Sequence, residues 1–226
     1  MGKTVNIAID GPAGAGKSTI ARALAKELGY YYVDTGAIYR TVAYFMDLLG
    51  VSPKDVDGVE RYIDELNVEI VYDETGKQHM LMNGMDVSDD IRTQDISQKA
   101  SLVSAHAVVR DVLLDMQRDV AKKNNVIMDG RDIGTVVLPK ADVKIFLTAS
   151  PEVRAKRRCD ELNAKGQKAD FQQTLKDIQQ RDYQDTHREI APLKMARDSI
   201  KVDTSELDIP GVISAIRAIV EEKLGK

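Results

Sequence analysis

Short apolar runs alternate along this chain with longer stretches in which apolar residues recur at helical spacing. The short runs predict strands at residues 5–10, 30–33, 126–129, 143–147 and 200–202. The periodic stretches predict helices at residues 17–28, 37–49, 94–105, 108–123, 171–188 and 210–224, and another that begins at Pro151. Strands joined through helices form βαβ units, so the order predicts an α/β fold with a parallel sheet core and helices on both faces.

The pattern changes from about Pro53. A short helical stretch leads to alternating segments at residues 68–72, 79–82 and 85–87, and the pair Asn83-Gly84 between the last two is a strong hairpin signal. We therefore expect a small antiparallel β-sheet, at about residues 66–90, inserted into the α/β core. On this sheet His79 is expected to be a surface histidine, and the methionines at 80, 82 and 85 are expected to pack.

The spacing within two helices predicts which side chains they bury. Helix 37–49 carries Ile38, Val42, Phe45 and Leu49 on one side, which leaves Arg40 free to point into a cleft near the end of strand 30–33. Helix 108–123 is expected to bury Val109, Val112, Leu113, Met116 and Val120.

Composition limits the classes of function. A chain of 226 residues forms one domain with an insertion or two small ones, and 43% hydrophobic with 30% charged residues is typical of a soluble globular protein. The net charge of −4 argues against a dominant nucleic-acid surface, although a basic cleft can hide within it. Cys159 is the single cysteine, which favours a small helical filler and the reducing cytoplasm. We expect no signal peptide, no membrane partner and no nucleic-acid partner.

The glycine-rich segment after the first strand carries the pattern G-x-x-x-x-G-K-[ST] at Gly11, Gly16, Lys17 and Ser18. A strand before it and a helix after it are the context in which this pattern is a phosphate-binding P-loop rather than an ordinary turn. Small residues let backbone N–H groups converge on phosphate, while the lysine reaches the terminal phosphates and the Ser18 hydroxyl is a magnesium ligand. The expected phosphate-binding residues are Gly11, Pro12, Ala13, Gly14, Ala15, Gly16, Lys17, Ser18 and Thr19.

Three further groups of charged residues are candidates for chemistry. Asp129 ends strand 126–129, where a magnesium-linked acid lies in proteins that carry a P-loop. Arg154, Arg157 and Arg158 share a helix face; this is a pattern typical of a solvated surface, but the loop Asn163–Gln167 that follows has the composition of a mobile lid. A third group shares one face of helix 171–188, and its spacing alone favours an exposed ion-pair ladder: Arg181, Asp185 and Arg188.

Several motifs together resemble the bacterial cytidylate kinase family: Asp10–Thr19, Asp34–Arg40, Asp129–Thr135, Lys144–Leu147, Arg181–Asp185 and Ala191–Leu193. The resemblance covers essentially the whole chain. It implies a single nucleoside monophosphate kinase domain over residues 1–226, with an acceptor part at 36–110 and a lid at 151–170. It also implies transfer of the γ-phosphoryl group of ATP to CMP or dCMP, with Mg²⁺, in pyrimidine nucleotide metabolism, by a monomer.

The same resemblance implies site residues. Arg40 and Arg131 would face the acceptor phosphate; Ser101, Arg110 and Asp132 the cytosine; and Arg181 with Asp185 the sugar. Family members carry Ser or Thr at the position of Thr35, so its hydroxyl is retained. The full acceptor set is Thr35, Arg40, Ser101, Arg110, Arg131, Asp132, Arg181, Asp185 and Arg188. The expected catalytic charges are Lys17, Arg131, Arg157 and Arg188.

Two other interpretations stay open at this stage. A P-loop kinase for another small acceptor has the same spacing, because only the resemblance identifies cytosine. A non-catalytic nucleotide-binding switch is the weaker interpretation: the D-x-x-G matches at residues 55–58 and 73–76 both fit turns, and Asn-Lys-x-Asp is absent from the sequence.

Overall fold

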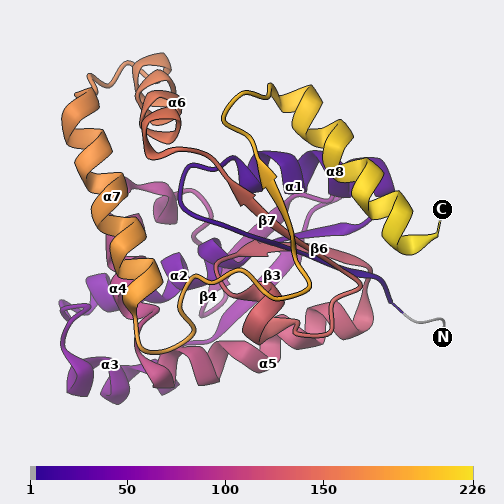
Figure 1. Ribbon diagram of the computed structural model, residues 1–226. Helices are drawn as coiled ribbons and strands as arrows, with labels where there is room; N and C mark the ends of the chain where they lie inside the picture. Colours follow the sequence, from indigo (N-terminus) through magenta and orange to yellow (C-terminus); the bar gives the residue numbers. More distant parts are fainter. Residues whose placement is uncertain (1–3, 226) are drawn as a thin grey trace. The chain divides into compact units, whose positions relative to one another are not determined.

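The computed structural model describes residues 4–225, and the chain within it forms two compact units (Figure 1). One unit comprises Val5–Tyr30 and residues 127–225 and contains the P-loop. The other comprises Tyr31–Val126 together with Thr4. Each unit has its own buried apolar side chains, and each carries part of the predicted site.

The P-loop unit is built on parallel strands. Its four strands follow the order β6-β1-β7-β8, and β1 with β7 and β7 with β8 are parallel, as predicted. Ile7 and Ile9 of β1 and Ile145 and Leu147 of β7 are completely buried, which fits a strand covered on both faces. The strands are β1 (Asn6–Asp10), β6 (Val126–Gly130), β7 (Val143–Thr148) and β8 (Ile200–Asp203).

The helices of this unit start and stop at the predicted signals. The helix α1 ends at Gly29, which adopts a left-handed conformation, and Ser150 caps α6 by accepting the Val153 N–H, with Pro151 in the first turn. The helix α8 packs on α1, and α6 packs along α7, where Cys159 is buried as a filler. The helices are α1 (Lys17–Leu28), α6 (Pro151–Ala164), α7 (Phe171–His187) and α8 (Ile209–Leu224), with a π-helical turn η3 (Ile133–Val137).

The other unit contains the inserted sheet. Its strands β3, β4 and β5 are antiparallel in that order, and the hairpin between β4 and β5 turns at Asn83 and Gly84, both at positive φ, as predicted. A cluster of apolar side chains from α2, α4, α5 and β4 forms the core. The strands of the inserted sheet are β3 (Val68–Tyr72), β4 (Gln78–Met82) and β5 (Met85–Asp86), and the unit also contains strand β2 (Tyr31–Asp34). The helices are α2 (Thr35–Leu48), α3 (Val56–Tyr62), α4 (Gln94–Val103) and α5 (Ala107–Lys123), with short 3₁₀ turns η1 (Ile63–Glu65) and η2 (Asp90–Arg92).

Three predicted core residues are exposed. Leu49 is 44% exposed because α2 has already ended at Leu48, and Val112 is 43% exposed because α5 turns Leu113 and Gln117 inward instead. Met85 is 61% exposed at the start of a two-residue edge strand. His79 does lie at the surface of β4, where its ring nitrogens face Asp73 and Asp86 at 3.2 and 2.8 Å.

Across residues 4–225, no helix is both long enough and apolar enough to cross a membrane.

Candidate active site

The P-loop has the shape that phosphate binding needs. A side chain on Gly11 would collide with the Leu147 carbonyl oxygen, so the loop passes against β7 only because this position is glycine. Gly14 and Gly16 have φ of 75° and 91°, a left-handed conformation that side chains disfavour. Gly16 immediately precedes α1. The first N–H groups of α1 and the positive end of its dipole therefore lie next to the loop.

Lys17 is buried at the start of α1 and donates from Nζ to the Pro12 carbonyl oxygen at 2.8 Å. Burial and the nearby positive charge of Arg131 lower the pKa of Lys17 to about 7, against the opposing effect of Asp129, Asp185 and Asp10. A bound polyphosphate would supply negative charge and favour the protonated amine. Lys17 is therefore placed to meet phosphate oxygens.

The Ser18 hydroxyl donates to Asp129 Oδ2 at 2.9 Å, and Asp129 is buried near the end of β6. No cluster of three or more His, Cys, Asp or Glu able to hold a metal occurs in residues 4–225. A P-loop magnesium site does not need such a cluster, because Mg²⁺ takes one or two protein oxygens and completes its shell with phosphate and water. Ser18 and Asp129 fit this donor set.

Asp10 was not among the residues predicted from the sequence. It ends β1, is buried, and accepts the backbone N–H groups of Ile133 and Gly134 at 2.8 and 2.7 Å. Burial raises the pKa of Asp10 to about 6, although the two N–H donors oppose this. An acid in the last position of a buried strand, directly before the P-loop glycine, was the available signal. Asp10 fixes the turn that follows Arg131 and Asp132.

The face of α7 that carries Asp185 is not an exposed ladder, so the interpretation that spacing favoured is wrong. Asp185 is 3% exposed and accepts from Arg131 Nε at 2.7 Å. Burial raises the pKa of Asp185, but the charges of Arg131, Arg181 and Arg188 outweigh burial and hold the pKa below its ordinary value. Arg188 Nη2 lies 3.5 Å from Asp132 Oδ1. The structure thus brings together five predicted acceptor residues in this unit: Arg131, Asp132, Arg181, Asp185 and Arg188.

The three arginines of α6 have different surroundings rather than one solvated face. Arg154 is buried, Arg157 donates to the Thr204 hydroxyl and carbonyl oxygens at 3.0 and 2.6 Å, and Arg158 pairs with Glu161 near the surface. Of these side chains, Arg157 was the one predicted to be catalytic, and here it contacts the segment after β8.

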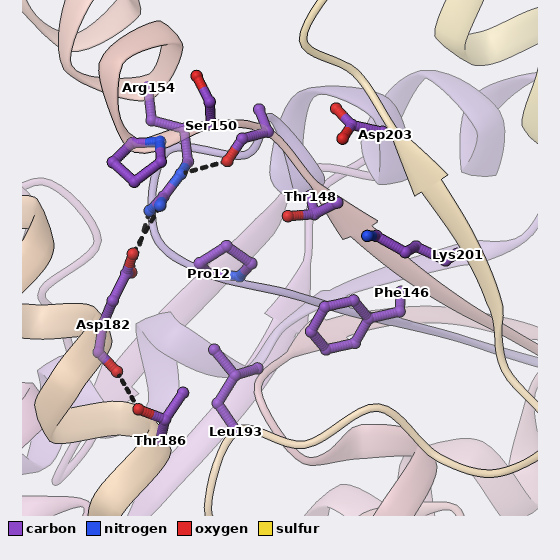
Figure 2. Close-up of a pocket in the computed structure, with 12 residues that line it drawn as sticks. Pro12, Phe146, Thr148, Ser150, Arg154, Asp182, Thr186, Leu193, Lys201 and Asp203 are labelled. Atoms are coloured by element: carbon purple, nitrogen blue, oxygen red, sulfur yellow. Dashed lines mark hydrogen bonds and ion pairs between the residues drawn. The ribbon is translucent and has the colours of Figure 1, made fainter.

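A cavity of about 390 Å³ lies beside Pro12 of the P-loop (Figure 2). Phe146 and Leu193 contribute apolar surface, and Lys201 and Asp203 of β8 contribute charge. The ends of β7 and β8, the start of α6 and the second half of α7 therefore meet around the loop.

The other unit holds the four remaining acceptor candidates. Arg40 points toward the end of β2, where its Nη2 lies 3.0 Å from Asp34 Oδ2. Asp34 also caps α2 by accepting the Ala37 N–H. Burial raises the pKa of Asp34, but Arg40 and the Ala37 N–H outweigh it and leave the pKa lowered. Thr35 is buried in the first turn of α2, and Ser101 is half-buried on α4.

Arg110 is buried on α5, donates to the Ser104 carbonyl oxygen at 3.1 Å and lies over the Tyr39 ring, 5.5 Å from its centroid. A guanidinium fixed by a carbonyl and an aromatic face is held in one orientation. It is thus suited to recognise a planar polar group.

A parallel-sheet core and a P-loop with a buried lysine and a serine–aspartate pair are the features of a P-loop nucleotide-binding protein. A solved structure of an uncharacterized protein from Eubacterium ventriosum has the same fold, with a TM-score of 0.51 at 14% identity over 97% of this chain and 99% of the other.

Sequence comparison identifies the family. The cytidylate kinase family model matches residues 7–222. The cytidylate kinase of an Exiguobacterium species is 47% identical over 98% of this chain and 99% of that protein, and that of Carboxydothermus hydrogenoformans is 47% identical over 97% and 98%. The chain belongs to the cytidylate kinase family, and this family implies ATP as the phosphoryl donor.

Proposed function

We propose that this protein transfers the γ-phosphoryl group of ATP to CMP or dCMP, giving ADP with CDP or dCDP, in pyrimidine nucleotide metabolism. The observation that carries the proposal is the buried cluster of Arg131, Asp132, Asp185 and Arg188 in the same unit as the P-loop, close enough that Arg131 and Asp185 perturb the pKa of Lys17. A binding-only switch has no use for such a cluster beside the lysine. Family membership supplies the choice of cytosine.

The donor side is proposed to bind through residues 11–19, with loop N–H groups and Lys17 on the phosphates. Mg²⁺ would be held by Ser18, with Asp129 bonded to that hydroxyl, and would neutralise charge on the phosphate oxygens. Phosphoryl transfer depends mainly on positioning and charge stabilisation, so no general base is assigned. Lys17, Arg131, Arg157 and Arg188 carry the positive charge; Arg157 would first have to leave Thr204.

Each unit has its own set of proposed acceptor contacts. In the P-loop unit, Arg131, with Arg188, suits the acceptor phosphate, because guanidinium forks match phosphate oxygens, and Arg181 with Asp185 suits the sugar hydroxyls. Asp132 suits the exocyclic amine of cytosine, since a carboxylate accepts from N–H. On the other unit the proposed contacts are Thr35, Arg40, Ser101 and Arg110.

The proposed divisions of the chain follow from these roles. Residues 36–110 form the acceptor-binding part and residues 151–170 the lid of one kinase domain. We further propose that the protein acts as a cytoplasmic monomer on small-molecule substrates.

An ATP-coupled assay across CMP, dCMP, UMP, AMP and GMP tests the function. Turnover with CMP and dCMP is expected, and phosphorylation confined to AMP or GMP would refute the proposal and favour a kinase for another acceptor. Asp132→Ala should lower kcat/KM for CMP more than for UMP, because a site built to pair the amine is selective through that pair. An unchanged ratio would assign Asp132 a different role, such as orienting Arg188.

A further inference from the structure

Arg154 is a buried charged side chain beside the P-loop that makes four hydrogen bonds. Its guanidinium donates from Nε to the Ala149 carbonyl oxygen at 2.9 Å and from Nη1 to the Ala13 carbonyl oxygen at 3.0 Å. It also holds Asp182 with both terminal nitrogens, at 3.0 and 2.6 Å. Only 3% of Arg154 is exposed. Figure 2 shows the guanidinium between Asp182 of α7 and the backbone that leads into α6.

The bond to Ala13 has a consequence for the peptide that joins Ala13 to Gly14. In a trans peptide the C=O and N–H groups lie in one rigid plane and point in opposite directions. No cis peptide occurs in residues 4–225. A guanidinium that holds the Ala13 carbonyl therefore also fixes the direction of the Gly14 N–H, away from Arg154. That N–H belongs to the loop expected to surround the phosphates.

The packing around the same peptide is close. An added Cβ on Gly14 would lie 3.3 Å from Arg154 Cβ, so a side chain at this position would press against α6. Gly14 is also held at φ 75°, a conformation it reaches without a side-chain penalty. A displacement of Arg154 is therefore transmitted to the Ala13–Gly14 peptide through the hydrogen bond to the Ala13 carbonyl.

Asp182 sets the position of Arg154. The two oxygens of Asp182 meet the two terminal nitrogens side by side, a geometry that fixes the plane of the guanidinium as well as its place. Asp182 lies one helical turn before Asp185, which holds Arg131. The helix that carries the proposed sugar-binding carboxylate therefore also holds, through Arg154, the backbone of the donor loop.

We propose that Arg154 and Asp182 are positioning residues that orient the Ala13–Gly14 peptide for the phosphates of the donor nucleotide. Neither side chain contacts the reacting atoms in this role. Arg154 differs in this respect from Arg157, which is proposed to act on the phosphates directly. The charge of Arg154 is already neutralised by Asp182 and is not available to phosphate. The inference rests on the proposed function, because it assigns a donor nucleotide to this loop.

The experiment measures the affinity of a non-hydrolysable ATP analogue and of CMP by calorimetry, together with kcat and both KM values. Asp182→Asn keeps the shape of the side chain but removes the charge and one acceptor oxygen. Arg154→Lys keeps the charge but has no planar fork to hold Asp182 and Ala13 together. Both variants should weaken binding of the ATP analogue by about tenfold to a hundredfold. This is no more than the loss of about a hundredfold or more that follows removal of one preorganised donor. Binding of CMP should weaken by less than about threefold. The matched control is Lys156→Ala, which breaks an exposed pair with Asp160 on the same helix and should leave both affinities unchanged.

Different results would refute the proposed function and the positioning role of Arg154 and Asp182. Wild-type protein that does not bind the ATP analogue would refute the proposed function. Wild-type protein that binds it, with Asp182→Asn and Arg154→Lys binding it within twofold of wild type, would overturn the positioning role even if both variants melt at lower temperature. Equal weakening of the ATP analogue and CMP would also overturn it, since a general loss of structure does not distinguish the two ligands. If Asp182→Asn does not fold, the test rests on Arg154→Lys, in which the loss of affinity for the ATP analogue is compared with the loss for CMP.

Discussion

Replacing Asp185 with Asn exchanges one carboxylate oxygen of a buried ion pair for an amide NH2 group. Asp185 accepts from Arg131 Nε at 2.7 Å, and the side chains of these residues are 5% and 19% exposed. Arg181 and Arg188 add positive charge around the same carboxylate. The variant retains a neutral oxygen for the hydrogen bond but leaves these guanidinium groups without the buried negative charge that balances them.

The expected loss of stability follows from this geometry. A hydrogen bond to a charged group contributes about 1.5–3 kcal/mol against about 1 kcal/mol for a neutral one, and removing one partner of a buried pair costs about 3–5 kcal/mol. Because Asn can still accept one bond, we expect a loss of about 2–4 kcal/mol in the free energy of unfolding. For a chain of this size, that corresponds to a fall in Tm of about 4–16 °C.

The pH dependence gives an independent check. Asp185 has a lowered pKa in the folded protein, so its contribution is present above the ordinary carboxyl pKa of about 3.9 and is lost as pH falls through the folded value. The stability difference between wild type and Asp185→Asn should therefore be smaller below about pH 4 than at pH 5.

Denaturant and thermal melts at several pH values measure the difference, and steady-state kinetics measure kcat/KM for CMP, which should fall by about a hundredfold if the carboxylate also binds the sugar. The matched control is Asp160→Asn, which removes a carboxylate from an exposed pair with Lys156 and should cost less than about 0.5 kcal/mol. The reasoning fails if Asp185→Asn melts like Asp160→Asn, or if the difference between wild type and Asp185→Asn is the same at pH 3.5 as at pH 7.

Other predictions concern the P-loop and the turn it contacts. Because Lys17 has a pKa lowered to about 7, binding of MgATP at pH 7.5 should take up about three quarters of a proton relative to Lys17→Arg, measured by calorimetry in buffers of different ionisation enthalpy; no difference would contradict the lowered pKa. For Asp10 the folded pKa of about 6 lies above the unfolded value, so the folded state holds this proton more tightly and stability falls as pH rises from about 4 to 6, by roughly 3 kcal/mol. Asp10→Asn should remove that slope from denaturant melts, and an identical slope in both proteins would exclude Asp10 as its source. Gly11→Ala should destabilise the protein by about 3 kcal/mol or more through collision with Leu147, whereas Gly29→Ala, which meets no neighbouring atom, should cost only about 1–2 kcal/mol; equal melts for the two variants would mean that the loop moves aside.

Local patterns determined the elements of this fold and the donor loop. The positions of the strands, the hairpin at Asn83-Gly84, the end of α1 at Gly29 and the N-cap of α6 at Ser150 all depend on a few neighbouring residues. Helix caps, positive φ and hydrophobic period act over such short distances, so sequence reasoning reaches them. The P-loop motif belongs to the same class, because its pattern lies within eight residues.

The tertiary structure decided which charged side chains are buried and with which partner. Spacing on α7 favoured a surface ladder, yet Asp185 meets Arg131, which is 54 positions away in the sequence. Arg154 was grouped with solvated arginines but reaches Ala13, 141 positions away, and Asp10 reaches a turn 123 positions away. A charged residue has the same helical spacing whether it faces water or a partner. Its role depends on what the packing of distant segments places opposite it, because burial without such a partner costs far more than exposure.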